Sequence, residues 1–492
     1  MSISLRIIPL VTLLTLLAGC AKTATPPPAE AVSTTTPPAG VESTTAAAPA
    51  TESPSATAGA GTPAALSESD LFPLTQEFIN QLAGGDYQAA TARFDDAMQK
   101  AAPAPTLKQI WEQLLGQVGA YQEQLDARAE QTGDYTSIYV TTKFEKADID
   151  IQVVFNSQGQ ISGLFFKPAK DSPAAPAAYT VPEYVDTQKF TETEVTIGSG
   201  DWSLPGLLSL PVGEGPFPAV VLVHGSGPND RDETIGPNKP FKDLAWGLAS
   251  QGIAVLRYDK RTKARAGQFT PDVISRLTVQ EETIDDALLG AQLLRQTEKV
   301  DPQRIYILGH SLGAMLAPRI GQQDPSLAGL VMLAAINRPL EDVVLDQMKY
   351  LFNLDGETDS QETAQLQALQ TQVANAKNPD LPDDTPAEEL PLGMPATYMR
   401  DLNGYVPSET AKSLALPMLV LQGGRDYQVS PTLDFESLKT GLAGKANTDF
   451  KLYPELNHLF IAGEGTSTPA EYEVAGHVSP QVITDIAAWI NQ

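Results

Sequence analysis

From about residue 184 onwards, short apolar runs alternate with longer stretches of helical period. The runs are 219–223, 253–258, 304–308, 329–333 and 418–421, and the helical stretches between them include 241–250, 279–297 and 312–322. Short apolar runs that are separated by helices are typical of buried parallel strands joined by crossover helices. This part of the chain is therefore predicted to fold as a doubly wound α/β sheet.

A Gly-x-Ser-x-Gly motif follows one of the predicted strands. Residues 309–313 read Gly-His-Ser-Leu-Gly, with Ser311 at the centre, and a helical stretch begins directly after the serine. Between a strand and a helix this motif is a nucleophile elbow, in which the serine occupies a strained turn and the glycines let strand and helix approach closely. Ser311 is therefore the candidate nucleophile.

A serine hydroxyl becomes a good nucleophile when a base takes its proton and an acid orients that base. His458 follows a predicted strand, and Asp426 follows the last of the apolar runs. Active sites of α/β sheets are built at such strand ends. The alternative base is His477, and the alternative acids are Asp401 and Asp434. All three lie outside strand-to-loop junctions. The predicted triad, Ser311, Asp426 and His458, has the chain order of α/β-hydrolases.

Such a triad also needs donors for the oxyanion that forms on the substrate. One predicted donor is the backbone amide of Leu312, at a helix start where the dipole favours negative charge. The loop after the run 219–223 reads His-Gly-Ser-Gly from His224 onwards and resembles the His-Gly oxyanion motif of esterases. This resemblance implies the amide of Ser226 as the second donor, and it implies that His224 is a structural hydrogen-bonding residue.

The surrounding motifs are more specific than the elbow. They are Asp230-Arg231-Asp232, Gly236-Pro237-Asn238-Lys239-Pro240 and Arg257-Tyr258-Asp259-Lys260-Arg261. With them, residues 67–492 resemble a family of bacterial α/β-hydrolase carboxylesterases, some of which carry a small domain in front. The resemblance implies hydrolysis of small-molecule carboxylic esters without a metal or organic cofactor. Peptidases and thioesterases use the same machinery and stay open as alternatives. Asp230, Arg231, Asp232, Arg257, Asp259 and Arg261 are expected to form an ion-pair scaffold that holds the oxyanion loop, with substrate binding as the alternative.

The N-terminal segment is predicted to be a targeting signal and a tether. Residues 1–19 carry one positive charge, an apolar stretch and then small residues, which is typical of a secretory signal peptide. The sequence Leu-Ala-Gly-Cys that ends at Cys20 resembles the lipobox of bacterial lipoproteins, which implies acylation of this cysteine. Residues 20–66 are mostly Ala, Thr, Pro and Ser and are predicted to be disordered. We expect an exported protein that a lipid anchors to a bacterial membrane, the outer membrane where the cell has one.

Two further regions flank or interrupt the predicted sheet. In residues 67–170, helical stretches at 71–82 and 107–125 precede three alternating strands, so a small α+β accessory domain is predicted. It resembles a domain of unknown function that often precedes secreted bacterial α/β-hydrolases. A Pro/Ala-rich linker, 171–183, leads to the catalytic domain, 184–492. Within that domain, residues of about 338–414 lack sheet character and are expected to form a helical cap over the site.

Composition excludes several other functions. The formal net charge of −27 repels phosphate backbones, so nucleic acid is not expected as a partner. The four histidines are widely scattered, which argues against a multi-histidine metal site. The oligomeric state stays open. A surface-tethered binding protein with an inactive hydrolase domain is the alternative to an enzyme, but the intact triad and oxyanion motifs argue against it.

Overall fold

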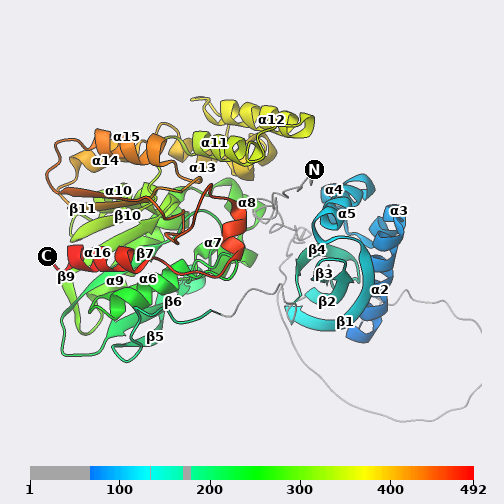
Figure 1. Ribbon diagram of the computed structural model, residues 1–492, viewed down its shortest axis with the longest axis horizontal. Helices are drawn as coiled ribbons and strands as arrows, with labels where there is room; N and C mark the ends of the chain where they lie inside the picture. Colours follow the sequence, from blue (N-terminus) through cyan, green and yellow to red (C-terminus); the bar gives the residue numbers. More distant parts are fainter. Residues whose placement is uncertain (1–66, 133–134, 170–178) are drawn as a thin grey trace, which may run out of the picture. The chain divides into compact units, whose positions relative to one another are not determined.

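The computed structural model describes residues 67–132, 135–169 and 179–492. The predicted signal peptide 1–19, Cys20 and the tether 20–66 lie outside the described residues, as does most of the linker 171–183. The described chain forms two compact units, the first ending before residue 170 and the second beginning after residue 178 in the sequence (Figure 1). Within these described ranges no helix is long and apolar enough to cross a membrane.

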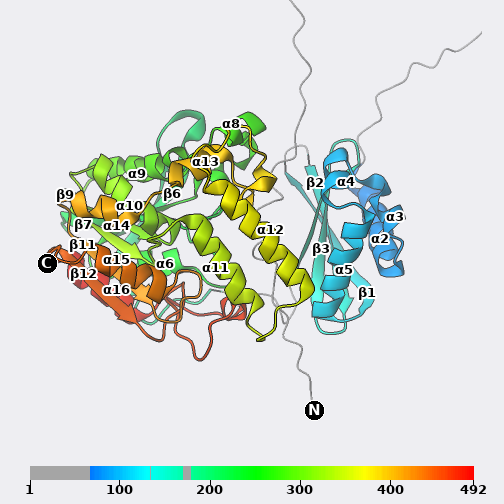
Figure 2. The ribbon, with the colours of Figure 1, turned by 90° about the horizontal axis from the view of Figure 1, so that it is seen from above.

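The first unit packs helices against one face of an antiparallel sheet (Figure 2). Its elements are α2 (Glu68–Gly84), α3 (Tyr87–Ala90), α4 (Asp96–Ala101), α5 (Ala104–Val118), β1 (Tyr121–Thr132), β2 (Tyr135–Phe144), β3 (Asp148–Phe155) and β4 (Ile161–Pro168). The strands form a meander in the order β1-β2-β3-β4. Buried Trp111 of α5 contacts Phe144 of β2, with ring centroids 5.7 Å apart. The apolar faces of the helices thus cover the sheet and form a separate core.

The helix predicted over 107–125 ends early, and a fourth strand takes up its last residues. α5 ends at Val118, and Gly119 follows with φ +82°, a conformation that favours glycine. From Tyr121 the chain pairs with β2 as strand β1. The three predicted strands are present as β2, β3 and β4, but the prediction of a helix to Leu125 was wrong and β1 was not predicted. The apolar residues continue at helical spacing across the glycine, so the pattern does not reveal where the backbone turns.

The second unit is built on an eight-stranded sheet in the order β12-β11-β10-β9-β7-β8-β6-β5. The strands are β5 (Phe190–Ile197), β6 (Leu204–Pro211), β7 (Phe217–Val223), β8 (Ala254–Tyr258), β9 (Val300–His310), β10 (Gly329–Leu333), β11 (Met418–Gly423) and β12 (Thr448–Tyr453). The strands from β7 to β12 pair in parallel, which confirms the predicted doubly wound sheet. An antiparallel hairpin, β5–β6, extends one edge. It was not predicted, because β5 is largely polar and β6 contains proline and glycine.

Helices lie on both faces of this sheet (Figure 1). They include α6 (Pro240–Ala249), α9 (Asp285–Arg295), α10 (Leu312–Gln323), α15 (Glu436–Gly441) and α16 (Pro480–Ile490). α6 and α16 pack together, whereas α9 and α10 pack on β9. The helix predicted over 279–297 begins with a π-helical turn, Gln280–Ile284, before α9. Such turns occur frequently at functional sites.

The segment between β10 and β11 forms the expected helical insertion. It contains α11 (Leu340–Phe352), α12 (Ser360–Ala376), α13 (Ala396–Leu402) and α14 (Pro407–Ser413), and the first two coincide with the helical patterns of the sequence at 340–352 and 361–377. Its small core consists of Ala376, Leu381, Leu390, Ala396 and Met399. The side chain of Gln347 on α11 donates a hydrogen bond to the carbonyl of Gln428, 2.8 Å away, in the loop after β11. The insertion is thereby fixed to the loop that carries Asp426.

Candidate active site

Ser311 occupies the sharp turn between β9 and α10. Its backbone has φ +54° and ψ −115°, a strained conformation for a residue other than glycine. A Cβ atom at Gly309 would overlap the backbone of Gly313, and one at Gly313 would overlap the carbonyl of Val223 in β7. Both glycines are therefore required for the close approach of the strand, the turn and the helix. Strain and packing together hold the serine at the carboxyl end of the sheet.

Asp426 and His458 meet at the neighbouring strand ends. Nδ1 of His458 donates a hydrogen bond to Oδ2 of Asp426 at 2.8 Å, and both side chains are buried. The carboxylate also accepts hydrogen bonds from the amides of Gln428 and Val429 and from the side chain of Gln422. These donors stabilise the charged carboxylate and fix its direction. A carboxylate at Nδ1 places the imidazole proton there, so Nε2 is left as a proton acceptor.

The structure brings Ser311 near this pair through its neighbour, His310. Nε2 of His310 lies 3.0 Å from the backbone carbonyl of His458, and the two imidazole centroids are 4.6 Å apart. Within the described residues, no hydrogen bond joins the hydroxyl of Ser311 to His458. Catalytic hydrogen bonds are often long in structures without substrate and tighten when substrate binds.

The oxyanion loop lies directly against the serine. A Cβ atom at Gly225 would be 3.3 Å from Cβ of Ser311. The amide of Gly225 donates to Oε1 of Glu233 at 2.7 Å, so it is not available to a substrate. Across the described part of the chain, no hydrogen bond leads from the amides of Ser226 or Leu312. These two amides, which we predicted as the oxyanion donors, thus have no acceptor within the described residues.

Glu233 and His310 form a buried ion pair below the elbow that sequence reasoning missed. Oε2 of Glu233 lies 2.9 Å from Nδ1 of His310. Burial alone would lower the pKa of His310, but the carboxylate of Glu233 outweighs burial and raises it above the ordinary value. Burial likewise opposes ionisation of Glu233, yet His310 lowers its pKa. The sequence offered one sign of this pair, because His310, at the second position of the Gly-x-Ser-x-Gly motif, is titratable.

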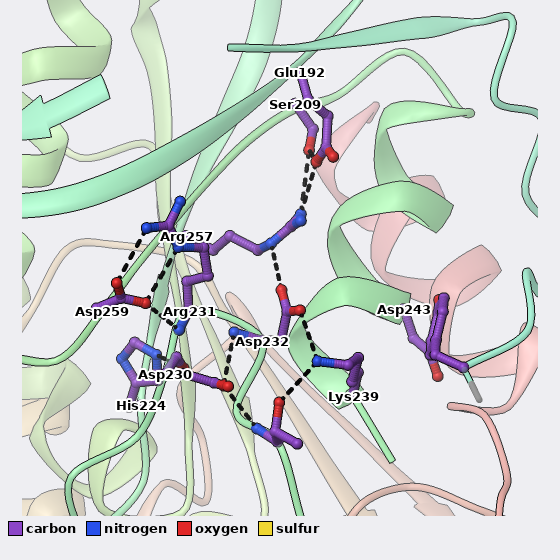
Figure 3. A network of polar contacts seen from close by, with 12 residues as sticks. Glu192, Ser209, His224, Asp230, Arg231, Asp232, Lys239, Asp243, Arg257 and Asp259 are labelled. Carbon is purple, nitrogen blue, oxygen red and sulfur yellow. Dashed lines mark hydrogen bonds and ion pairs between the residues drawn. The ribbon is translucent and has the colours of Figure 1, made fainter. Parts of the chain in front are cut away.

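The oxyanion loop is supported by a network of charged residues (Figure 3). Arg231 pairs with Asp259 at 3.0 Å, and buried Arg257 pairs with Asp232 at 3.0 Å. Asp232 also pairs with Lys239. All of these except Lys239 were expected in the ion-pair scaffold, whereas Arg261, which was also expected there, pairs with Asp286. Within this network, Nε2 of His224 donates to the carbonyl of Asp230 at 3.0 Å.

His224 acts as a structural residue, as predicted. Burial lowers its pKa to about 4, so the ring is neutral at physiological pH. Its imidazole packs between the rings of Phe241 and Tyr258, with centroids 4.8 Å and 5.2 Å away. A buried neutral ring that donates to a backbone carbonyl fixes the loop and takes no part in proton transfer.

The rival residues lie elsewhere in the second unit. His477 contacts Asp243, which also accepts a hydrogen bond from Tyr179, a residue of the predicted linker. Asp401 pairs with Arg319, and Asp434 pairs with Arg338. Among the residues that the structure describes, no three His, Cys, Asp or Glu side chains gather as metal ligands.

A nucleophile elbow at the carboxyl edge of a doubly wound sheet, beside a buried Asp–His pair, defines the class of this protein as a serine hydrolase of the α/β-hydrolase fold. Residues 216–464 match the model of the serine aminopeptidase S33 family, and residues 75–164 match a family of unknown function, DUF3887. The chain is 41% identical over 413 residues to esterase EstD of Thermotoga maritima, which covers 84% of this chain and 93% of that protein.

Other similarities are more local. Esterase FrsA of Yersinia pestis is 30% identical over 138 residues, which cover 28% of this chain and 30% of the relative. An esterase structure from Pyrococcus furiosus aligns with a TM-score of 0.38 and 16% identity, over 58% of this chain and 89% of that chain. The match to EstD decides the family. The chain belongs to the same family of esterases as EstD, and it is a carboxylic ester hydrolase.

Proposed function

We propose that this esterase hydrolyses small, short-acyl esters through an acyl-enzyme intermediate on Ser311. The observation that carries the proposal is the buried Asp426–His458 pair, because it leaves Nε2 of His458 as the proton acceptor beside the elbow. In the first half-reaction Nε2 takes the hydroxyl proton while Oγ attacks the ester carbonyl carbon. The amides of Ser226 and Leu312 stabilise the oxyanion. The bond to the alcohol oxygen then breaks, and the leaving alkoxide takes the proton from His458.

In the second half-reaction, water replaces the alcohol. His458 accepts a proton from the water molecule, whose oxygen attacks the acyl carbon of the acyl-serine. When the bond to Oγ breaks, the proton returns to Ser311 and the carboxylic acid leaves. Asp426 accepts the Nδ1 hydrogen bond throughout and stabilises the imidazolium without taking its proton. The resemblance to cofactor-free carboxylesterases agrees with this sequence of steps.

The insertion supports the preference for short acyl groups. Tyr350 of α11 stacks on Tyr427, the residue after Asp426, with ring centroids 5.1 Å apart and planes at 6°. Tyr427 is stacked in turn on Tyr472, with centroids 6.2 Å apart. We propose that these stacked rings, which join the insertion to the loop that carries Asp426, limit the room for the acyl group.

A series of p-nitrophenyl esters of increasing acyl length tests the proposal, with the matching p-nitroanilides run beside it. We expect kcat/KM to be highest for short acyl groups, and intact mass spectrometry of rapidly quenched samples should detect acylated enzyme. The anilides test the peptidase alternative, which the name of the matched S33 family suggests. Anilide hydrolysis as fast as ester hydrolysis would replace esterase with amidase as the main activity.

We further propose that the protein is exported and held at a bacterial membrane by lipid on Cys20. The support comes from the sequence, in which the single cysteine stands at the end of a short apolar leader and begins a polar tether. Membrane fractionation of a Cys20 variant tests this localisation.

A further inference from the structure

Lys260 lies beneath the oxyanion loop and is almost completely buried, with 1% of its surface exposed. Its Nζ donates a hydrogen bond to the carbonyl of Gly225 at 2.9 Å and lies 3.1 Å from Oε1 of Glu282, which is also buried. Burying an ammonium group costs free energy unless it is paired and hydrogen-bonded. Glu282 meets the need for a counter-charge, and the remaining contact of Lys260 is with the backbone that carries the oxyanion donor.

The geometry of the peptide bond gives this contact its meaning. The bond between Gly225 and Ser226 is trans, so the Gly225 carbonyl and the Ser226 N–H point in opposite directions. When Lys260 holds the carbonyl, it directs the N–H of Ser226 away from Lys260, from the opposite edge of the planar peptide. Glu233 fixes the other side of Gly225 by accepting its amide hydrogen. Two buried charged groups therefore set the orientation of this loop.

We infer that Lys260 is a positioning residue that orients and polarises the Gly225–Ser226 peptide, so that the Ser226 amide binds the oxyanion. A cation at a carbonyl oxygen draws electron density from the amide, which makes its N–H a stronger donor. Lys260 touches no reacting atom and acts through the peptide. The inference rests on the proposed function, because it takes the Ser226 amide to be a donor to the oxyanion.

The counter-ion connects this device to the insertion. Glu282 lies in the π-helical turn before α9, and its Oε2 accepts a hydrogen bond from the hydroxyl of Tyr398 at 2.7 Å. Tyr398 belongs to α13 of the insertion and is buried. Two hydrogen bonds and the Lys260–Glu282 ion pair thus connect the insertion to the oxyanion loop.

The double variant Lys260→Met/Glu282→Gln tests the inference, because it removes both charges and leaves neither one buried alone. The matched control is Arg295→Met/Asp324→Asn, which removes a partly buried ion pair at the C-terminal ends of α9 and α10 that does not contact Gly225. We expect kcat for p-nitrophenyl acetate to fall about 10- to 100-fold in the test variant, with KM changed less than about threefold. The inhibition constant of an alkylboronic acid, which forms a tetrahedral anion on the serine, should rise by a similar factor. The control should keep kcat and boronate affinity within about threefold.

Equal kcat and boronate affinity in the test and control variants would overturn the inference, and so would a loss seen in KM alone. If the double variant does not fold, Lys260→Gln/Glu282→Gln replaces it with polar side chains and is judged by the same measurements. Failure of the proposed function looks different, because Ser311→Ala would then stay active. A wild-type enzyme that needs Ser311, together with an unaffected Lys260 variant, contradicts the inference alone.

Discussion

Nδ1 of His310 lies 2.9 Å from Oε2 of Glu233, in a buried ion pair that connects three parts of the active site. The second carboxylate oxygen of Glu233 accepts the amide hydrogen of Gly225, and Nε2 of His310 donates to the carbonyl of His458. One pair therefore connects the oxyanion loop, the residue before the nucleophile and the loop of the base. Stability and catalytic geometry should both depend on it.

The ion pair predicts a characteristic pH dependence of folding stability. The pKa of His310 is raised in the folded state, so its contribution is complete below the ordinary value of 6.5 and is lost as pH rises through the folded pKa. The pKa of Glu233 is lowered, so its contribution is complete above 4.5 and is lost as pH falls through the folded pKa. Glu233→Gln should therefore lower the free energy of unfolding most between these two values.

Urea unfolding measures this difference. Near pH 5.5 we expect Glu233→Gln to cost about 3 kcal/mol, because it leaves one buried partner unpaired. The cost should be smaller at alkaline pH, above the folded pKa of His310, which is raised from its ordinary value by Glu233. The control is Glu194→Gln, which removes a largely exposed partner of Arg231 and should change stability by less than about 0.5 kcal/mol. An equal loss at both pH values would contradict a charged His310–Glu233 pair.

Replacing the nucleophile should abolish ester hydrolysis without unfolding the protein. Ser311→Ala is expected to lower kcat by about 10⁵ or more, because the hydroxyl supplies the covalent step. Far-ultraviolet circular dichroism and the melting temperature should stay close to wild type, since alanine fits the space of the serine side chain. Activity near that of the wild type in the folded variant would show that Ser311 is not the nucleophile.

The base is tested by comparing two histidines. His458→Ala should reduce kcat about as much as Ser311→Ala, because residues that act as one catalytic unit fail together. His477→Ala should retain most activity, because His477 contacts Asp243 and Thr180 and no residue of the proposed triad. The same ester assay with both variants decides the assignment, and the opposite order of activities would make His477 the base.

Candidate catalytic residues were easier to propose from the sequence than the buried residues that hold the loops around them. Ser311, Asp426 and His458 follow strands of the sheet, and strand ends can be recognised from apolar runs and turn residues. Lys260 and Glu233 lie in loops without periodicity, and their roles depend on burial and on backbone angles, such as φ +51° at Glu233, that no sequence pattern reveals. Side-chain spacing likewise failed to reveal β1 and the β5–β6 hairpin.

The predicted lipid anchor is tested by changing Cys20 to serine. A serine has no thiol to acylate, so the variant should appear in the soluble fraction or accumulate as unprocessed precursor. Membrane fractionation and the electrophoretic mobility of the protein measure both outcomes. The wild-type protein should resist extraction by high salt but not by detergent. A Cys20→Ser protein that remains membrane-bound to the same extent would contradict the lipoprotein interpretation.

The second unit should carry the chemistry without the first. Residues 179–492 contain the whole eight-stranded sheet, the elbow, the oxyanion loop and the insertion, and the two units have separate hydrophobic cores. A protein that begins at Tyr179 keeps the hydrogen bond from its hydroxyl to Asp243, 2.8 Å away. Its kcat/KM for a small soluble ester should be within about tenfold of that of the full chain, a difference below about 1.4 kcal/mol.

A shorter fragment that begins at Asp186 is the control for the truncation. It lacks Tyr179, so it should melt at a lower temperature, because Asp243 is buried and loses one of its hydrogen-bond donors. Below that melting temperature, its kcat should match that of the longer fragment, since neither residue is part of the proposed triad. If the fragment 179–492 is folded by circular dichroism but loses several orders of magnitude in kcat/KM on small esters, the first unit contributes to the active site. The accessory role predicted for residues 67–170 would then be wrong.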